Sequence, residues 1–414
     1  MALSFSVLRN RNFRLLLLTR MFAGLALQSQ AVIVGWQVYS LTKDPLLLGL
    51  VGLTEAVPAI ICALFAGHIV DHSQPKKIYR NCQFVQMINI FLLFLVAGGH
   101  VHIGDDNVLP FLFAGVFISG LARSFYMPAS FTLLAQTVSK ADMPAASAWM
   151  SSSAQTAFVA GPAIGGLVYG GYGVTVAWAV PLFFITTCFL MICAIKLPPV
   201  IRDLSKKLSA VLSIQEGWGF ILGNPVLLSI MALDMFAVLF GGAVAMLPAF
   251  ADQVLFLGPE GLGALRAAPA IGAVTMGLFL ATRPMRVIST KRLLLAVTGF
   301  GLCMIGFGLS KIFWLSLVFL ILSGVCDSAS MVIRGTLMQL LTPENMRGRV
   351  SSVNSMFIIS SNEIGAFESG VAAKFFGLVP SIVFGGCGTL TVAALTSLSK
   401  KFRRTVVHSN QLSN

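Results

Sequence analysis

Charged side chains are scarce in this sequence. They make up 10% of the 414 residues, whereas about a quarter is usual in soluble domains. Hydrophobic residues make up 57%, and the mean hydropathy is +0.87. These values exclude an ordinary soluble domain and indicate a chain that crosses a membrane many times.

The motifs of common enzyme classes are also missing. The sequence has no His-Glu-x-x-His, no Gly-x-Ser-x-Gly and no Gly-rich loop ending in Lys-Ser/Thr, the motifs that mark zinc proteases, serine hydrolases and ATP-binding sites. Seven cysteines lie in or beside apolar stretches without metal-ligand spacing. His68, Asp71 and His72 could hold a metal, but a solvated helix end is favoured. We expect no enzyme, cofactor, metal or ATP-driven step.

Long apolar stretches are what the sequence has instead. Because a transmembrane helix needs about 20 apolar residues, twelve helices are predicted, at 13–40, 45–70, 78–98, 109–136, 146–170, 174–196, 225–251, 262–281, 292–310, 312–341, 350–376 and 380–398. Leu197-Pro198-Pro199 ends the sixth. An N-terminal six-helix bundle at 1–196, a cytoplasmic linker at 197–224 and a C-terminal six-helix bundle at 225–414 follow.

Positive charges are unevenly distributed over the predicted loops. If the N-terminus is cytoplasmic, 21 of the 28 lysines and arginines fall in inside segments, and only Lys43, Arg266, Lys311 and Lys374 fall in outside loops. The positive-inside rule then predicts that both termini are cytoplasmic. This distribution accounts for the net charge of +13, so we expect no nucleic-acid partner.

The stretch from 119 to 166 occurs twice. Shifted by 204 positions, Ser119, Gly120 and Gly166 fall on Ser323, Gly324 and Gly370, while Arg123 is answered by Asp327. A second echo matches Arg20-Met21-Phe22-Ala23 with Asp234-Met235-Phe236-Ala237. Parallel repeats of this kind build one large class of secondary transporter, whose substrate site lies between the halves.

Ionisable side chains inside the predicted helices are the functional candidates, because a charge at the bilayer centre is costly. They are Arg20, Glu55, Arg123, Asp234, Asp327, Arg334, Glu363 and Glu368. In one interpretation the arginines bind an anionic or polyhydroxylated substrate while a carboxylate carries a proton. In the other, Arg20 with Asp234 and Arg123 with Asp327 are mainly structural pairs. Both can hold, since a pair made in one conformation acts as a gate.

Three loop and helix motifs carry a family resemblance. Gly67, Asp71, Lys76 and Lys77 form a loop that resembles the motif between the second and third helices of the major facilitator superfamily, although Ser73 to Pro75 depart from it. Gly161-Pro162-Ala163-Ile164-Gly165-Gly166 resembles the signature of facilitators that work as antiporters, or is a well-packed helix. Asn10-Arg11-Asn12-Phe13-Arg14 and Thr342 to Val350 resemble the branch that contains the enterobactin exporter and the macrolide efflux proteins.

This resemblance implies an all-α integral membrane protein of two six-helix bundles related by a pseudo-twofold axis, with alternating access. It implies a monomeric transporter in the bilayer of the inner (cytoplasmic) membrane that exports a small molecule, a siderophore, in exchange for protons. Multidrug or macrolide efflux and proton-coupled import of a metabolite or metal chelate are the alternatives.

We assign the expected roles as follows. Substrate contacts are expected at Gln30, Trp36, Arg123, Tyr126, Asp327 and Arg334. Proton coupling is expected at Asp234, Asp327, Glu363 and Glu368. Conformational roles are expected for Arg20, Asp71, Lys76, Lys77, Gly161, Pro162, Gly165, Arg347 and Arg349.

Overall fold

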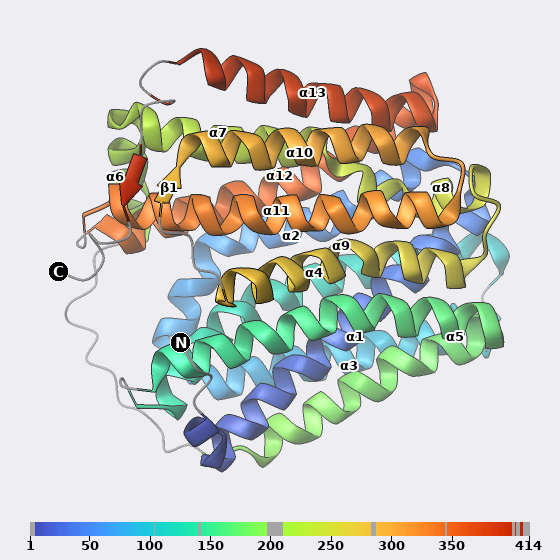
Figure 1. The fold of residues 1–414 in the computed structure, drawn as a ribbon. Helices are drawn as coiled ribbons and strands as arrows, with labels where there is room; N and C mark the ends of the chain where they lie inside the picture. Colours follow the sequence, from blue (N-terminus) through green and yellow to red (C-terminus); the bar gives the residue numbers. More distant parts are fainter. Residues whose placement is uncertain are drawn as a thin grey trace. The chain divides into compact units, whose positions relative to one another are not determined.

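Long helices make up nearly all of the protein (Figure 1). The computed structural model describes residues 5–102, 104–139, 142–196, 210–282, 287–343, 346–399, 402 and 406–408. These residues form two compact units. Unit 1 comprises the described residues of Met1–Lys43, Thr54–Lys207 and Leu257–Ala267, and unit 2 those of Asp44–Leu53, Leu208–Phe256 and Ala268–Asn414.

Unit 1 is built on five long helices and a short 3-10 turn. They are η1 (Phe5–Arg9), α1 (Arg11–Thr42), most of α2 (Pro45–His72), α3 (Pro75–Val96), α4 (Asp105–Thr137) and α5 (Met143–Ala194). Within α5, Gly173 has φ +81° and kinks the helix, a conformation that favours glycine. The kink falls between the predicted helices 146–170 and 174–196, so α5 is long enough for both.

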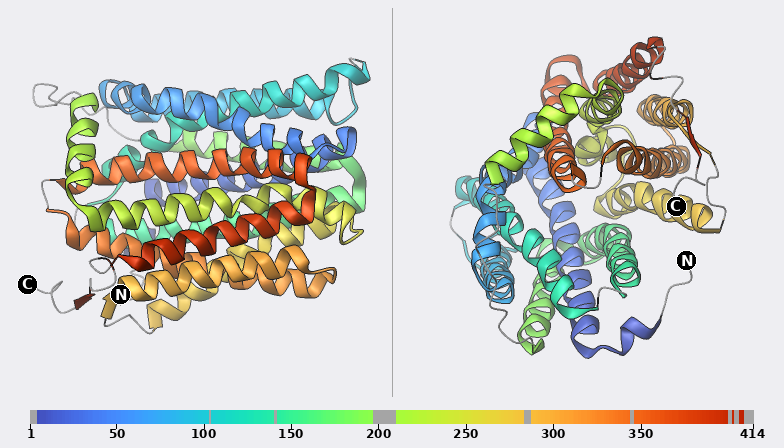
Figure 2. Two further views of the ribbon diagram at one scale, coloured as in Figure 1. Left: turned by 90° about the horizontal axis from the view of Figure 1, so that it is seen from above. Right: turned by 90° about the vertical axis from the view of Figure 1, so that its left-hand side faces the viewer.

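Unit 2 contains the remaining elements. They are α6 (Ala210–Gly223), α7 (Pro225–Phe240), η2 (Gly242–Met246), α8 (Leu247–Gln253), most of α9 (Pro259–Thr282), β1 (Val287–Ser289), α10 (Thr290–Leu309), α11 (Phe313–Leu341), α12 (Arg347–Phe376), α13 (Leu378–Leu398) and β2 (Val406–His408). Helix α6 packs on α7 and α12 and lies across their ends (Figure 2).

Nine segments of the described chain are long and apolar enough to cross a membrane. One is the stretch Ala145–Ala194, and another joins α7 to α8 as Pro225–Gln253. Helix α2 contributes a shorter apolar segment, Pro45–Pro58. The all-α membrane fold is confirmed, and the count of twelve spans stays a prediction.

The asparagines of the N-terminal motif anchor the start of α1 inside unit 1. The Asn10 side chain accepts hydrogen bonds from the backbone N–H of Asn12 and Phe13 as an N-cap. Its Nδ2 donates to the Thr137 carbonyl at 2.8 Å, and Asn12 Nδ2 donates to the Lys196 carbonyl at 2.8 Å. The motif therefore ties α1 to the ends of α4 and α5.

Two helices begin in one unit and continue in the other. The first residues of α2, Asp44–Leu53, belong to unit 2, and the first residues of α9, Leu257–Ala267, belong to unit 1. In unit 2, a Cβ on Gly370 would lie 3.0 Å from Gly49 Cα; in unit 1, a Cβ on Gly166 would lie 2.6 Å from Gly263 Cα. These contacts explain why the repeat ends on a glycine in both copies. The division at 1–196, 197–224 and 225–414 stays a prediction.

A small ribbon closes the loop side of unit 2. Strands β1 and β2 pair antiparallel, with Val287 opposite His408 and Ser289 opposite Val406. Beside the ribbon, Thr290 Oγ1 donates to the Phe402 carbonyl at 2.5 Å, and the Phe402 ring is fully buried in the apolar core of unit 2. The chain after α13 is thereby attached to the start of α10.

Candidate substrate and proton sites

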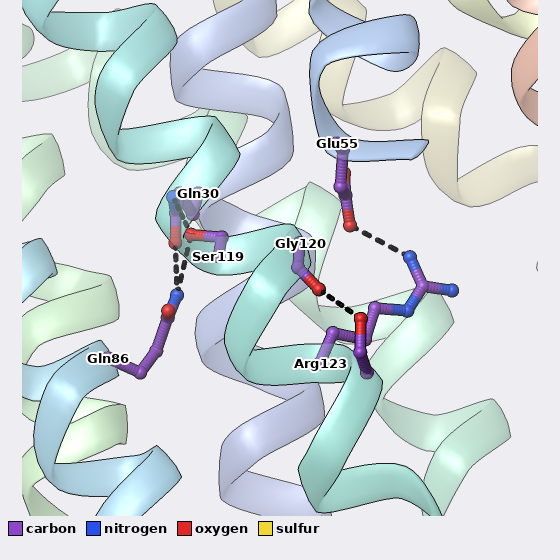
Figure 3. Close-up of polar contacts among 7 residues, drawn as sticks. Gln30, Glu55, Gln86, Ser119, Gly120 and Arg123 are labelled. Atoms are coloured by element: carbon purple, nitrogen blue, oxygen red, sulfur yellow. Dashed lines mark hydrogen bonds and ion pairs between the residues drawn. The ribbon is translucent and has the colours of Figure 1, made fainter. Parts of the chain in front are cut away.

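An ion pair between α2 and α4 is the first polar site of unit 1 (Figure 3). Arg123 Nη1 donates to Glu55 Oε1 at 2.8 Å. The two helices approach closely because Gly120, one turn before Arg123, has no room for a Cβ beside the Glu55 carbonyl. The side chains of Arg123 and Glu55 are 41% and 28% exposed, so the pair can be reached from outside the helix packing.

A cluster of amides around Ser119 lies elsewhere on α4 (Figure 3). Ser119 Oγ accepts from Gln30 Nε2 at 3.1 Å, Gln86 Nε2 at 2.9 Å and Asn89 Nδ2 at 3.1 Å. Gln86 Nε2 also donates to Gln30 Oε1 at 3.1 Å. All four side chains are buried. The cluster joins α1, α3 and α4, and its burial shows that Gln30 holds these helices together.

The other polar and aromatic candidates of unit 1 make local contacts. Arg20 Nη1 donates to Ser130 Oγ at 3.2 Å, and its guanidinium lies 5.8 Å from the centre of the Phe131 ring. The Tyr126 ring meets Tyr79 edge-on, with the ring centres 5.7 Å apart. Trp36 is half-buried. Their roles toward a substrate or a gate stay predictions.

A buried ion pair and a small cavity form the polar site of unit 2. The Arg334 guanidinium pairs with the Asp234 carboxylate, and the side chains are 6% and 11% exposed. The cavity is lined by Asp234, Ala237, Val238, Val297, Phe300, Asp327 and Ser330. Its volume of about 10 Å³ is on the order of one water molecule.

Asp327 is the carboxylate of this cavity for which the described residues show no ion pair. Two carboxylates with one guanidinium leave an excess negative charge. Because a low-dielectric surrounding disfavours an uncompensated charge, protonation of Asp327 would relieve it. The site can therefore take up and release a proton.

The sequence pattern suggested Arg20 with Asp234 and Arg123 with Asp327. Each of these pairs would join one unit to the other, and they stay predictions. The ion pairs that the structure shows, Arg123 with Glu55 and Asp234 with Arg334, each lie inside one unit. Sequence reasoning did not find Glu55 as the partner of Arg123; the signal was Gly120, which marks where α2 and α4 touch.

The antiporter-like signature lies in a helix contact. A Cβ on Gly161 would lie 2.5 Å from Gln28 Cβ, and one on Gly165 would lie 3.0 Å from Ser29 Cα. Pro162 between them is buried. The three residues let α5 pack closely on α1, and a conformational role for them stays a prediction.

The remaining predicted residues lie at helix ends or on α12. Lys76 Nζ donates to the Ile195 carbonyl, and Lys77 is exposed. Arg349 Nη1 lies 2.5 Å from Glu216 Oε2 of α6. Glu368 is half-buried. The side chains of Asp71, Arg347 and Glu363 lie outside the described part of the structure.

Comparison with known proteins decides the family. The sequence model described as Major Facilitator Superfamily matches residues 16–366. The chain belongs to this superfamily. Its members are transporters rather than enzymes, so this chain is a multi-pass membrane protein that acts on a small-molecule substrate.

Curated relatives include the enterobactin exporter EntS. The chain is 26% identical over 408 residues to EntS of Shigella boydii serotype 4, covering 95% of this chain and 94% of that protein. It is also 26% identical over 406 residues to EntS of Escherichia coli O1:K1, with the same coverage.

Solved structures agree on the fold. The nucleoside transporter NupG has a TM-score of 0.74 at 12% identity, covering 94% of this chain and 99% of that one. A D-xylose–proton symporter has a TM-score of 0.71 at 13% identity, covering 94% and 97%. These likenesses show the facilitator fold.

Proposed function

We propose that this transporter exports a small organic molecule, a siderophore, across the cytoplasmic membrane by proton antiport with alternating access. The likeness to EntS over nearly the whole chain supports the substrate class. The charge distribution over the predicted loops supports cytoplasmic termini. The described carboxylates favour protons as the coupling ion, and we expect the protein to work as a monomer.

The observation that carries the proposal is the Asp327 carboxylate in the cavity beside the Asp234–Arg334 pair. A polyhydroxylated substrate donates hydrogen bonds to a carboxylate that has lost its proton. Protonated Asp327 offers a poorer acceptor, so proton and substrate hydroxyl groups compete for the same oxygen atoms. Competition of this kind couples the two in opposite directions, because each can bind only after the other leaves.

The arginines of unit 1 supply the complementary chemistry. A guanidinium carries five N–H donors and matches carboxylate or phenolate oxygens. Arg123 is exposed enough to reach such a group. We assign Arg123 to acceptor oxygens of the substrate and Asp327 to its hydroxyl groups.

Transport in inside-out vesicles tests this function. With an acidic interior, the wild-type protein should accumulate a catecholate siderophore and release protons to the outside. Asp327→Asn should lose gradient-driven uptake by at least about tenfold while it inserts normally. Asp142→Asn is the matched control, because Asp142 lies in a connection and bonds locally to Ser139. Unchanged gradient-driven uptake by Asp327→Asn would remove Asp327 from the coupling.

Efflux of cationic drugs or macrolides is the second candidate. It is favoured by the same Asp327 carboxylate, which can pair with an ammonium group of a substrate as readily as with a proton. Saturating uptake of a macrolide, with none of the siderophore, would select it. Gradient-driven movement of either compound in the opposite direction would select import.

A further inference from the structure

The ion pair of unit 1 differs from that of unit 2 in how far it is shielded. Arg334 and Asp234 are 6% and 11% exposed, whereas Arg123 and Glu55 are 41% and 28% exposed. A shielded pair holds together because separation would leave two buried charges. A pair that other groups can reach is weakened by solvent and can be exchanged for another partner.

The backbone holds Glu55 at Arg123 whatever partner the guanidinium binds. Gly120 keeps the Glu55 carbonyl against α4 without room for a Cβ, and Pro58 of the next turn of α2 lies against the same glycine. The Glu55 carboxylate therefore stays close when its ion pair opens (Figure 3). It is then a carboxylate without its counter-ion, which favours the protonated form.

We propose that Glu55 occupies the place of an anionic group of the substrate, and that a substrate carboxylate or phenolate displaces it from Arg123 as Glu55 takes up one proton. This inference rests on the proposed function, because it names the substrate class that Arg123 selects. Arg123 stays protonated throughout. The Glu55 carboxylate becomes a carboxylic acid, and the guanidinium exchanges one anion for another, so charge is conserved at the site.

Proton and anion thus bind together at this pair. By linkage, the anion then binds more tightly as the pH falls, and its binding takes up protons. The titratable and charged groups that act on this region in the described part of unit 1 are Arg123, Arg20, Tyr126 and Cys188. The arginines stay charged across neutral pH, and the phenol and thiol stay neutral there, so the pH dependence reports Glu55.

Ligand binding to the purified protein in detergent tests the inference without any gradient. The probes are 2,3-dihydroxybenzoate and its neutral amide, 2,3-dihydroxybenzamide, titrated calorimetrically in buffers of different ionisation enthalpy. The wild-type protein should bind the carboxylate more tightly at lower pH, with proton uptake. Glu55→Gln should bind it about tenfold more tightly at neutral pH, without pH dependence or proton uptake. Affinity for the amide should change little.

Two further variants guard against loss of folding. Arg123→Gln should lose the preference for the carboxylate over the amide, and Glu55→Asp, whose shorter side chain reaches Arg123 less well, should retain pH dependence with tighter binding. Wild-type affinity and pH dependence in Glu55→Gln would overturn the inference, as would failure of folded Glu55→Gln to bind the carboxylate.

The inference and the proposed antiport fail separately. Loss of the pH-linked binding leaves gradient-driven flux in vesicles to be explained by Asp327. Gradient-independent flux in vesicles would reject antiport while the binding result at Glu55 stands.

Discussion

The two units place the same contacts at equivalent positions and fill them with different chemistry. Arg20 of α1 meets Ser130 of α4 in unit 1. The residues that the repeat aligns with them, Asp234 and Arg334, meet between α7 and α11 in unit 2. The helix contact is kept, and the partner of the cation changes from a hydroxyl to a carboxylate.

The second polar position shows the same divergence. Gly120 lets α4 approach the Glu55 carbonyl, and Gly324 lets α11 approach the Pro269 carbonyl. Arg123, near Gly120, has a carboxylate partner in Glu55, whereas its counterpart Asp327 lines a cavity. Unit 1 thus presents two arginines and one glutamate, and unit 2 two aspartates and one arginine. Duplication preserved the packing while the charges became complementary in sign.

The largest difference between the units should come from removing one cation from each. Arg334→Ala leaves Asp234 buried without its counter-ion, which costs about 3–5 kcal/mol. Arg20→Ala removes a hydrogen bond to a hydroxyl and should cost about 1 kcal/mol. Thermal unfolding of the two variants in detergent measures the difference. Equal losses would mean that the pair of unit 2 is no more important to stability than its counterpart.

The double variant Arg334→Leu with Asp234→Leu is the control for that comparison. It removes both charges and should recover most of the stability lost in Arg334→Ala, since no buried charge remains. Transport, in contrast, should stay impaired.

Aligned serines give the next comparison. Ser119 Oγ accepts from three buried amides, whereas Ser323 Oγ donates to the Leu320 carbonyl one turn earlier at 2.7 Å. Ser119→Ala should cost about 1–3 kcal/mol, because it leaves buried amide donors without an acceptor. Ser323→Ala should cost less, about 1 kcal/mol or below. The two unfolding midpoints test this order, and a larger loss for Ser323→Ala would contradict it.

The repeat and the loop motifs could be predicted from the sequence because they lie in its linear order. The copied glycines of 119–166 and 323–370 indicated helix contacts, and Gly120, Gly166, Gly324 and Gly370 do lie against neighbouring backbones. The spacing of Gly161 and Gly165 likewise predicted tight packing, which the contact with α1 confirms.

The partners of the charged residues could not be predicted in the same way. Glu55 and Arg123 are far apart in the chain, and what joins them is the crossing of α2 and α4 at Gly120. Gln86 and Asn89 read as ordinary polar residues of an apolar helix until α1 and α4 supply their partners. Helical periodicity gives the face of a residue but not the helix that covers that face.

The smallest expected effect concerns the start of α2 in unit 2. The Lys374 ammonium pairs with the Asp44 carboxylate in the connection between α1 and α2. Its hydrogen bond is the main cause that lowers the pKa of Asp44 below its usual value. The residues aligned with this pair in unit 1 are Gly258 and Gly170, so unit 1 lacks an ion pair at this position.

Because the pKa of Asp44 is lower in the folded protein, the pair stabilises the fold above the usual pKa of an aspartate and is lost as the pH falls through the folded value. Asp44→Asn should therefore lower the unfolding temperature slightly at neutral pH, by less than about 1 kcal/mol for so exposed a pair. The gap to wild type should close in acid and in high salt. Gly258→Asn, in the corresponding connection of unit 1, is the control that should show no such dependence on pH. A gap that widens in acid would show that the carboxylate of Asp44 does not stabilise this contact.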